Sequence, residues 1–337
     1  MSTTPQSAPP NPERIFNAIN AFQLTEAMKA ALVLGVFTSI AERATDAASI
    51  ARSVSASERG VRILCDYLTV KGFLTKADGR YALEQDSALF LNRNSPAYVG
   101  SIANFLASDH HRAAHRNITE AVRRGGCAVN DPFEPDDPVW VLFARHMMPM
   151  MRMPSENLAT ALIKEAPARK VLDIAAGHGL YGIAVARHNP DAHIYALDWP
   201  KVLEVATENA HEAGVSARHH LIPGSAFDAP FGEGYDVVLI SNFLHHFDRE
   251  TCIAFLRKVH ASLIPGGRAA ILELVPNPDR VTPPTPAAFS LIMLASTPSG
   301  DAYTFAELAS MAQAAGFSRV IPSDVPVMPM QLVLAYK

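Results

Sequence analysis

The stretch that decides the fold is Val171-Leu172-Asp173-Ile174-Ala175-Ala176-Gly177-His178-Gly179-Leu180-Tyr181-Gly182. It begins as a short apolar run that is typical of a buried strand. Its three glycines follow a G-x-G-x-x-G pattern, which lets the backbone turn tightly and lie close to a bound cofactor. Asp198, 21 residues after Gly177 at the end of the next predicted strand, is placed to accept hydrogen bonds from ribose hydroxyls. Taken alone, the pattern fits NAD and S-adenosylmethionine equally well.

Asp173 separates these two cofactors. It stands four residues before Gly177, where a carboxylate can hold a cationic amino-acid group through a water molecule. A pyrophosphate beside the same carboxylate would be repelled, because both groups are negative. We therefore expect S-adenosylmethionine as the cofactor, with an NAD-dependent dehydrogenase as an alternative.

Outward from this turn, predicted strands alternate with predicted helices. The strands are residues 170–175, 193–198, 218–223, 235–241 and 268–274, and two more strand-like runs follow at 318–325 and 330–336. Residues 201–213 form a helix that ends at Gly214, and Thr304 and Glu307 form a capping box that opens another helix. This order predicts an α/β fold, namely a Rossmann-like, doubly wound, mostly parallel sheet with a C-terminal antiparallel hairpin, over residues 166–337.

The N-terminal part of the chain has a different pattern. Residues 12–41 carry apolar residues at a spacing of three to four and predict a helix. Two shorter helices follow at 47–54 and 58–71, and then a hairpin that turns at Asp78-Gly79. Three helices and a small hairpin are typical of a winged helix, so the α/β domain is preceded by a mainly α-helical domain. We place this winged-helix domain at residues 13–95, after a mobile tail at residues 1–12 that holds four prolines.

Winged helices often bind DNA, but the balance of charged residues in this domain argues against DNA binding. Residues 46–90 hold six basic and six acidic residues, whereas DNA-binding domains normally present a basic face. We interpret this domain as one for packing and dimerisation; a ligand-sensing regulator is an alternative that rests on the winged helix alone. Between the two domains, residues 96–165 are predicted to be a helical linker with substrate-pocket helices, at 98–125 and 138–164.

The composition of the 337 residues restricts the partners further. Hydrophobic residues make up 49% and the formal net charge is −4, so nothing overall attracts nucleic acid or an anionic membrane. Cys65, Cys127 and Cys252 lie far apart, so neither a disulfide framework nor a zinc knuckle is expected. No apolar run reaches the roughly 20 residues that a membrane span needs, and the first residues lack the order of a signal peptide. We expect a cytoplasmic protein.

These motifs together resemble a known family. The glycine turn, Asp198, the strand at 235–242 and the turn at 263–268, with a winged helix in front, are similar to class I S-adenosylmethionine-dependent methyltransferases. After residue 12 the chain resembles their two-domain small-molecule O-methyltransferases, which include plant phenolic and acetylserotonin methyltransferases. The resemblance implies methyl transfer to a hydroxyl of a small aromatic or natural-product acceptor. It also implies a homodimer formed through the N-terminal domain, with no nucleic-acid or membrane partner.

The resemblance also assigns the cofactor site. The residues implied are Asp173, Ala175, Gly177, Gly179, Asp198, Trp199, Ser225, Ala226, Phe227, Ser241 and Asn242. Two of the family's glycine positions are alanines here, Ala175 and Ala176. An extra methyl group is tolerated where the backbone is not at positive φ, so we expect cofactor binding to survive. Ser225 stands where the family commonly has Asp, so Asp228 is an alternative partner for the adenine amino group. Trp199 either flanks the adenine or is an ordinary core or surface aromatic.

The family's catalytic pair is His-Asp, and this chain has His245-His246 in its place. The resemblance implies that His245 is the general base, with a structural or substrate-binding histidine as the alternative. Glu273 matches the first carboxylate that orients the imidazole in the family. The second orienting glutamate falls on Ala302 and is absent, and the neighbouring Asp301 is a candidate replacement. The catalytic residues predicted are thus His245, Glu273 and His246.

The substrate pocket is expected on the helices around the sheet. Its predicted residues are Phe105, His111, His146, Met147, Phe289 and Met293, with Phe143, Met150, Met153 and Leu294 as further candidates. Methionine-rich apolar walls suit a flat aromatic acceptor, although such stripes also occur in plain cores. Some relatives that methylate carbon hold iron near the His-Asp position. Here no Glu or Cys completes a ligand set with the clustered histidines His110, His111, His115, His146, His245 and His246, so no metal is predicted.

His246 and Ala302 keep a further alternative open. Because the chain departs from the family at these two positions, an enzyme of the same fold that methylates carbon, or that uses the bound cofactor for non-methylating chemistry, also fits the sequence.

Overall fold

The computed structural model describes residues 11–127, 137–327 and 329–337, and these divide into two compact units that meet between Ala107 and Ser108. The tail predicted for residues 1–12 lies outside the described residues except for its last two. The division falls inside the region predicted as a linker, so part of the predicted pocket helices belongs to the same unit as the sheet.

The first unit is a small helical domain with one hairpin. Its elements are α1 Glu13–Ile19, α2 Ala21–Leu34, α3 Val36–Ala41, α4 Ala47–Ser53, α5 Glu58–Val70, β1 Leu74–Ala77, β2 Arg80–Leu83, α6 Gln85–Phe90, η1 Gly100–Ile102 and α7 Ala103–Leu106. The single helix expected over 12–41 is wrong, because the chain breaks at Asn20 and again at Gly35, whose φ of 79° ends α2 in the left-handed region. The winged-helix pattern of α4, α5 and the β1–β2 hairpin is as predicted.

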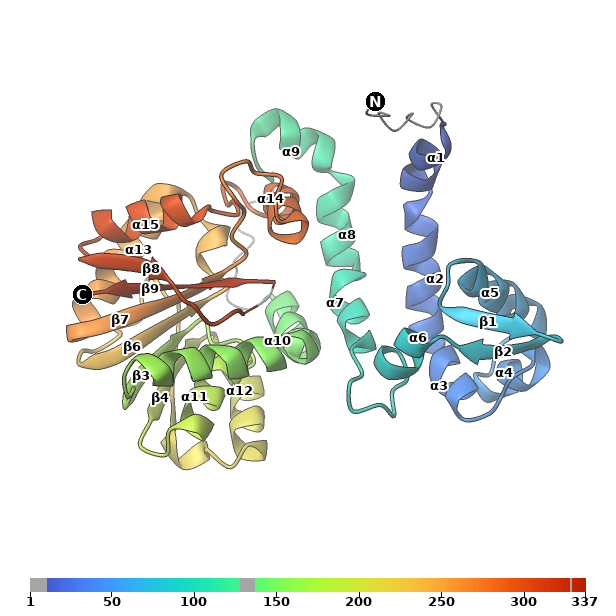
Figure 1. Cartoon of the computed structure of the whole chain (residues 1–337), viewed down its shortest axis with the longest axis horizontal. Coiled ribbons are helices and arrows are strands. Elements are labelled where there is room, and N and C mark those ends of the chain that lie inside the picture. The colour runs from blue at the N-terminus through green and yellow to red at the C-terminus, as the bar shows by residue number, and fades with distance from the viewer. Residues whose placement is uncertain (1–10, 128–136, 328) are drawn as a thin grey trace, which may run out of the picture. The chain divides into compact units, whose positions relative to one another are not determined.

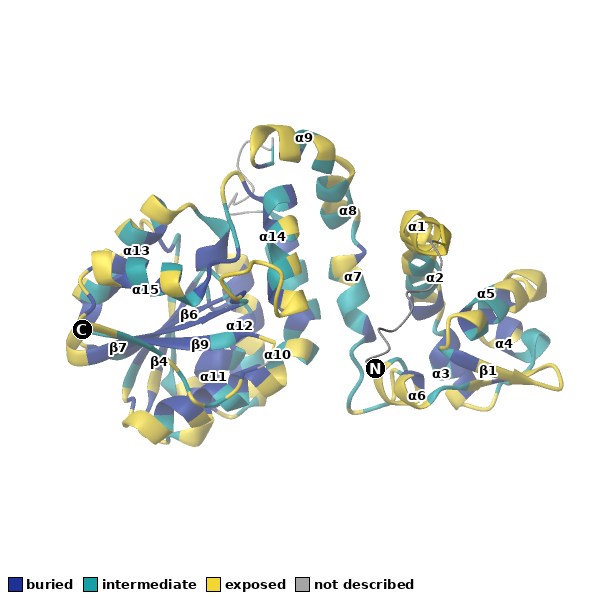
Figure 2. Ribbon diagram, turned by 45° about the horizontal axis from the view of Figure 1, so that its top comes forward, coloured by how far each residue is buried: buried dark blue, intermediate teal, exposed yellow. Residues whose placement is uncertain are grey.

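Two faces of this unit differ in burial. Phe37, Ile50, Leu68 and Leu74 form its core together with the other buried side chains of α3, α4, α5 and the hairpin. By contrast, α1 has no buried residue, and Figure 2 shows it exposed along its length. Among the exposed side chains of α1 and the start of α2 are four large apolar ones that are more than half exposed, namely Ile15, Phe16, Ile19 and Phe22.

The second unit begins with helices and continues as an α/β sheet (Figure 1). Its elements are α8 Asp109–Arg116, α9 Ile118–Arg124, α10 Pro138–Glu165, β3 Lys170–Ile174, α11 Leu180–His188, β4 His193–Asp198, α12 Pro200–Glu212, η2 Ser216–Arg218, β5 His219–Pro223, β6 Tyr235–Ser241, η3 Leu244–His246, α13 Arg249–Ser262, β7 Leu263–Glu273, α14 Pro284–Ser296, α15 Phe305–Ala314, β8 Arg319–Pro322 and β9 Gln331–Tyr336. The predicted helix at 138–164 corresponds to α10, whereas the one at 98–125 is broken into η1, α7, α8 and α9.

The sheet has the order β5-β4-β3-β6-β7-β9-β8, with β3 to β7 parallel and β9 antiparallel to both of its neighbours. This confirms the predicted doubly wound sheet with its C-terminal hairpin. The chain runs outward from β3 to β5 and then returns to β6 on the other side of β3. Such a switch point opens a crevice at the carboxyl ends of the two central strands, which is where α/β proteins of this kind bind ligands.

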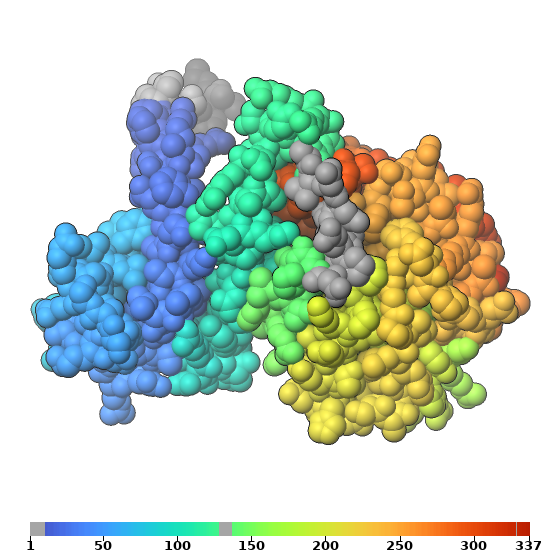
Figure 3. Space-filling view, turned by 180° about the vertical axis from the view of Figure 1, so that it is seen from behind, coloured from blue at the N-terminus to red at the C-terminus, as the bar shows by residue number. Residues whose placement is uncertain are grey.

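Two apolar layers hold the sheet between helices. One face packs on α13 and α15 around residues such as Leu172 and Val238, and the other packs on α10 and α11 around Val171 and Leu239. The central strands are buried on both faces and are therefore almost wholly apolar, as parallel sheets require. In the space-filling view α9, in green, adjoins the orange-red of α14, with which α8 and α9 are in contact (Figure 3). In the described part of the chain, no helix has the length and apolar character needed to cross a membrane.

Candidate active site

The glycine turn lies at the carboxyl end of β3. Two of its glycines have positive φ, and the third allows close packing. Gly177 has φ 58° and Gly179 has φ 73°, values that L side chains rarely adopt. A Cβ on Gly182 would lie 2.5 Å from Ile194 Cγ2, so this glycine lets α11 pack closely on β4. Beside Gly177 the space is open, with Ala175 O the nearest atom at 3.8 Å. The turn is thus shaped to let a ligand approach its backbone.

Asp198 holds this turn in place as well as closing β4. Its Oδ2 accepts the Gly177 N–H at 2.7 Å and its Oδ1 accepts the Trp199 N–H at 2.7 Å. The carbonyl oxygen of Asp198 accepts the Gly224 N–H at 3.0 Å. Burial raises the pKa of Asp198 to about 6. The carboxylate and the backbone carbonyl of Asp198 together therefore join the glycine turn to the ends of β4 and β5, at the edge where a ribose is expected.

The condition for tolerating an extra methyl group, a backbone outside the positive-φ region, is not met at Ala175. Its φ is 51°, in the left-handed region, where an alanine is disfavoured by ~1–2 kcal/mol relative to the usual backbone. Ala176 does not share this strain; it is buried, and its N–H donates to Leu197 O at 3.1 Å. The chain therefore accepts backbone strain next to Asp173, at a position where the sequence pattern of the family has glycine.

Two buried polar groups beside the turn have no partner. Asp173 is 1% exposed; its Oδ2 accepts the Gly182 N–H at 3.0 Å, while its Oδ1 meets no donor within the described residues. Ser241, at the end of the neighbouring strand β6, has a buried hydroxyl that is likewise unpartnered there. Burial raises the pKa of Asp173 to about 7. Buried polar atoms normally have partners, so this pair fits a ligand that brings a donor, above all a cation.

His245 and Glu273 meet on the other side of the crevice. Glu273 ends β7 and is buried; its Oε1 accepts the N–H groups of Phe243 at 3.0 Å and Leu244 at 2.7 Å. Its Oε2 lies 2.5 Å from Nδ1 of His245, whose side chain is 6% exposed. Because Nδ1–H donates to the carboxylate, Nε2 is the nitrogen that carries the lone pair. The sequence placed both residues in one site, and the structure brings them into contact.

A turn after α14 fixes the other side of the histidine, and the sequence analysis did not find it. A Cβ on Gly300 would fall on His245 O and would lie 2.6 Å from Thr297 Oγ1. The same turn contacts the residues after α9: Cys127 N–H donates to Thr297 O at 2.8 Å, and a Cβ on Gly126 would fall on Pro298 O. In the sequence, the one sign of this close contact is a glycine, Gly300, between the end of α14 and the capping box at Thr304.

His246, predicted as a catalytic residue, lies directly beside His245. Its ring centroid is 4.2 Å from that of His245 and 5.9 Å from that of Trp140. Its Nδ1 lies 3.1 Å from Phe243 O, to which a neutral ring can donate. Burial, with His245 as a second cause, holds the pKa of His246 well below its ordinary value. The residue beside the proposed base is therefore neutral near pH 7.

Asp301 does not replace the missing glutamate at Ala302. Its carboxylate accepts from Arg280 at 3.0 Å and from the Ala302 N–H at 2.8 Å. Arg280 also donates to Ala302 O at 2.9 Å and to Glu307 at 2.6 Å, so it ties the loop before α14 to the start of α15. Glu273 is thus the carboxylate that the described residues place against His245.

The predicted pocket residues differ in burial and in position. The ring of Phe289, from α14, stands edge-on to His245 with a centroid distance of 4.8 Å. Met147 and Met293 are buried, whereas Met150 and Met153 are exposed and do not form a wall within this unit. The half-buried members are His111, Phe143, His146 and Leu294. Phe105 belongs to α7 of the first unit, and its role stays a prediction. Over the described ranges, no three His, Cys, Asp or Glu side chains gather as metal ligands would.

The loop after β5 carries the remaining cofactor candidates. Ser225 O accepts the Ala229 N–H at 2.9 Å, and Ser225 Oγ accepts the Phe227 N–H at 3.1 Å. Ala226 is buried, while Phe227 is 40% exposed and packs edge-on against Phe247 at 4.9 Å. Asn242, at φ 54°, follows β6. Trp199 is half-buried and packs with side chains of α10 and α12, so part of its ring serves that cluster.

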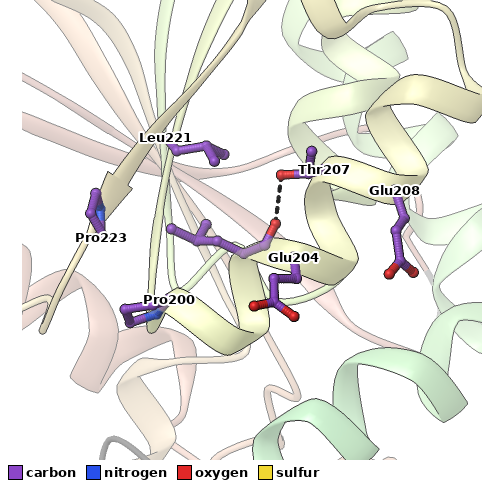
Figure 4. A pocket seen from close by; sticks show the side chains of 7 residues that line it. Pro200, Glu204, Thr207, Glu208, Leu221 and Pro223 are labelled. Carbon is purple, nitrogen blue, oxygen red and sulfur yellow. Dashed lines mark hydrogen bonds between the residues drawn. The ribbon is translucent and has the colours of Figure 1, made fainter.

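A separate surface hollow lies on the outer side of α12 and β5 (Figure 4). It is lined by Pro200, Leu203, Glu204, Thr207, Glu208, Leu221 and Pro223. None of these is a predicted site residue, and Glu208 is paired with Arg145 at 2.8 Å. The predicted site residues therefore lie outside this hollow.

Comparison with known proteins gives consistent matches to both halves of the chain. A family model described as the O-methyltransferase domain matches residues 123–318, and one described as the O-methyltransferase dimerisation domain matches residues 16–93. Among solved structures, a candidate O-methyltransferase from Nostoc punctiforme is 49% identical with a TM-score of 0.95, covering 98% of this chain and 100% of that one.

Curated proteins agree with these matches. Acetylserotonin O-methyltransferase of Mus musculus is 27% identical over 340 residues, which cover 94% of this chain and 87% of that protein. The 3-hydroxy-5-methyl-1-naphthoate 3-O-methyltransferase of Streptomyces sahachiroi is 29% identical over 302 residues, which cover 88% of this chain and 86% of that protein.

Proposed function

The chain belongs to the S-adenosylmethionine-dependent O-methyltransferases, which act on hydroxyls of small aromatic or natural-product molecules, and we propose that His245 is its general base. The observation that carries this proposal is the 2.5 Å contact between His245 Nδ1 and Glu273 Oε2. It makes Nε2 the atom that takes the acceptor's hydroxyl proton. Glu273 holds the ring and stabilises the imidazolium that results.

S-adenosylmethionine, when bound, supplies the sulfonium methyl group that the acceptor oxygen receives. The residues of the glycine-turn side fit this cation. Asp173 Oδ1 and Ser241 Oγ offer buried acceptors that lack a partner among the described residues, and the open backbone at Gly177 leaves room for a close approach. We assign Asp173 to the ammonium end and Asp198 to the ribose hydroxyls, because a carboxylate accepts hydrogen bonds from both.

Phe289 and Met293 support an aromatic acceptor. The ring of Phe289 is perpendicular to that of His245 with a centroid distance of 4.8 Å. Met293 lies one turn further along α14 and is buried, so a flat ring would have an apolar wall beside the base. A phenol titrates near pH 10 and an imidazole near 6.5, so the proton moves to Nε2 only as the oxygen forms its bond to the methyl carbon. We propose a phenolic hydroxyl as the preferred acceptor.

The first unit, in our proposal, forms a homodimer. The match to the dimerisation-domain model supports this, and so do the large apolar side chains that α1 and the start of α2 leave exposed, Ile15, Phe16, Ile19 and Phe22. Exposed apolar surface of this kind on one helix is typical of an interface between subunits.

Two measurements on the full chain test the proposal. Calorimetric titration should show binding of S-adenosylmethionine and S-adenosylhomocysteine, with NAD as the negative control. Formation of S-adenosylhomocysteine should then depend on a phenolic acceptor such as a naphthol, and should not occur with the saturated alcohol of the same ring size. Failure to bind either adenosyl compound would contradict the cofactor assignment; turnover with both alcohols alike would contradict the aromatic acceptor.

A further inference from the structure

Lys258 makes an unusual set of contacts with the loop after β5. Its Nζ donates to three backbone carbonyls, those of Ala226 at 3.2 Å, Phe227 at 2.7 Å and Ala229 at 2.8 Å. These use all three N–H groups of the ammonium. The same Nζ lies 4.1 Å from the ring centroid of Phe231, a cation–π distance. One side chain of α13 thus contacts most of the segment 226–231.

The other contacts of this loop are the packing of Ala226, Ala229 and Phe231 in the core and a few hydrogen bonds. Its own backbone bonds run back to Ser225, from Asp228 N–H at 3.2 Å and from Ala229 N–H at 2.9 Å. Three carbonyl oxygens that converge on one point repel one another unless a cation lies between them. Lys258 supplies that cation as a charge-assisted donor, which makes stronger hydrogen bonds than a neutral one. Without it, the carbonyls would turn away and the loop would open.

A second residue of the same helix face extends the support. Phe255, three residues before Lys258, has its ring centroid 5.8 Å from that of Phe227 and 4.9 Å from that of Phe243. Residues three apart lie on one face of a helix, so α13 presents a lysine and a phenylalanine to this region together. It connects the loop after β5 to the segment that follows Asn242.

We propose that Lys258 is a positioning residue for cofactor binding: by gathering the carbonyls of Ala226, Phe227 and Ala229 it gives the segment 225–229 the shape that receives the adenosine end. This rests on the proposed assignment of that segment to the cofactor. Lys258 touches no reacting atom in this scheme. Its effect therefore falls on the affinity for the cofactor, and the rate at saturation stays the same.

Lys170 provides a matched control. Its Nζ donates to Glu233 O at 2.6 Å and lies over the rings of Tyr195 at 5.3 Å and Tyr235 at 4.6 Å. Lys170 thus also donates to a backbone carbonyl and lies over aromatic rings. It is the first residue of β3 and stands at the amino end of that strand, whereas the crevice lies at the carboxyl end. Lys170→Met removes a contact with the last part of the same loop, at Glu233, and leaves the segment 225–229 untouched.

The experiment compares Lys258→Met, Lys258→Arg and Lys170→Met in the full chain. For Lys258→Met we expect the dissociation constants of S-adenosylmethionine and S-adenosylhomocysteine, and KM for the former, to rise at least about tenfold, equivalent to the loss of one or two net charge-assisted bonds, with kcat at saturation unchanged. Lys258→Arg should recover part of the affinity, because it keeps the charge and several donors. Lys170→Met should bind as the wild type does.

Amide hydrogen exchange of the cofactor-free proteins provides a readout that needs no binding. Faster exchange over 224–231 in Lys258→Met, and not in Lys170→Met, supports the part of the proposal in which Lys258 shapes this segment. A wild type that binds neither adenosyl compound would overturn the proposed function, and with it the link from this shape to the cofactor. Wild-type exchange in that segment, or wild-type affinity in Lys258→Met when the wild type binds, overturns the role of Lys258. A fall in kcat with unchanged KM also overturns it.

Discussion

Around His245 both oxygens of Glu273 already have donors, whereas at the glycine turn Asp173 Oδ1 and Ser241 Oγ have none within the described residues. The first region is complete without any ligand, so it can hold the base in one orientation before the acceptor arrives. The second is complete only when a ligand brings donors. The comparison shows one crevice divided into a preorganised proton-accepting side and a side whose polar groups await a cation.

Among the variants that leave His245 itself in place, Glu273→Gln is expected to have the largest effect. The amide oxygen can still accept from Phe243 and Leu244, but its nitrogen then faces His245 Nδ1. The imidazole must accept there and carry its proton on Nε2, so it no longer serves as a base. We expect kcat to fall by about 10²-fold or more, as for other orienting carboxylates, with calorimetric affinity for the cofactor unchanged.

The control for this variant is Glu156→Gln, which changes an exposed His–Glu pair with His188 at 2.7 Å. It should leave kcat as it is. A Glu273→Gln enzyme that turned over at the wild-type rate would show that the carboxylate does not orient the base.

Gly300→Ala changes the turn that contacts the backbone of His245. The added methyl group would overlap His245 O and push the histidine away from its place. We expect the unfolding free energy to fall by ~1–3 kcal/mol, as for overpacking, and kcat to fall about tenfold because the base is displaced. Gly126→Ala, which overlaps Pro298 O on the far side of the same turn, should cost stability but spare kcat. Equal losses of kcat in both would refute a specific role for the His245 contact.

At the glycine turn, the pH dependence of cofactor affinity tests the role of Asp173. Its pKa of about 7 lies above the ordinary 3.8, so in the cofactor-free protein it is largely protonated below pH 7. A cationic ligand favours the carboxylate, so binding must release a proton. We expect affinity to rise by up to about tenfold per pH unit below pH 7 and to level off above it. Calorimetry in two buffers of different ionisation enthalpy measures the released proton.

Asp173→Asn should bind more weakly and lose most of this pH dependence. The sign for stability is opposite to that for affinity. Burial raises the pKa of Asp173 in the folded state, so between about pH 4 and 7 the folded protein keeps a proton that the unfolded chain has lost. The unfolding free energy of the cofactor-free protein therefore falls as pH rises through that window. Uptake of a proton on binding, or binding at pH 6 without release of a proton, would contradict a cation beside Asp173.

The smallest expected effect is at Ala175. Ala175→Gly relieves the φ of 51° and should raise the unfolding free energy by ~1 kcal/mol or less, since glycine also gains entropy in the unfolded chain. Ala176→Gly, one residue later and without positive φ, should lower it instead. Thermal unfolding of both variants measures the difference, and two changes of the same sign would argue against strain at Ala175.

The sequence was enough to predict what depends on local pattern. The bounds of β4 and β6 agree with the prediction to the residue, and the capping box at Thr304 and Glu307 is present. Asp173 and Asp198 fall at the ends of neighbouring strands, as the alternation of strands and helices required.

What could not be predicted depends on contacts between distant segments. An alanine gives no sign of positive φ, so the strain at Ala175 was missed. Gly35 breaks a helix that the apolar spacing alone continues. Gly300 and Lys258 act through residues 55 and 29 to 32 positions away, and nothing in the local pattern marks such partners.

The central claim is that His245 takes the acceptor's proton, and single-turnover methyl transfer by His245→Asn tests it most directly. With the cofactor bound at saturation and a phenolic acceptor in excess, we expect the rate to fall about 10²–10⁴-fold, as for loss of a general base, with cofactor affinity unchanged. His188→Asn, from the exposed His–Glu pair, should react at the wild-type rate. A His245→Asn enzyme that transfers the methyl group as fast as the wild type would contradict the assignment of the base.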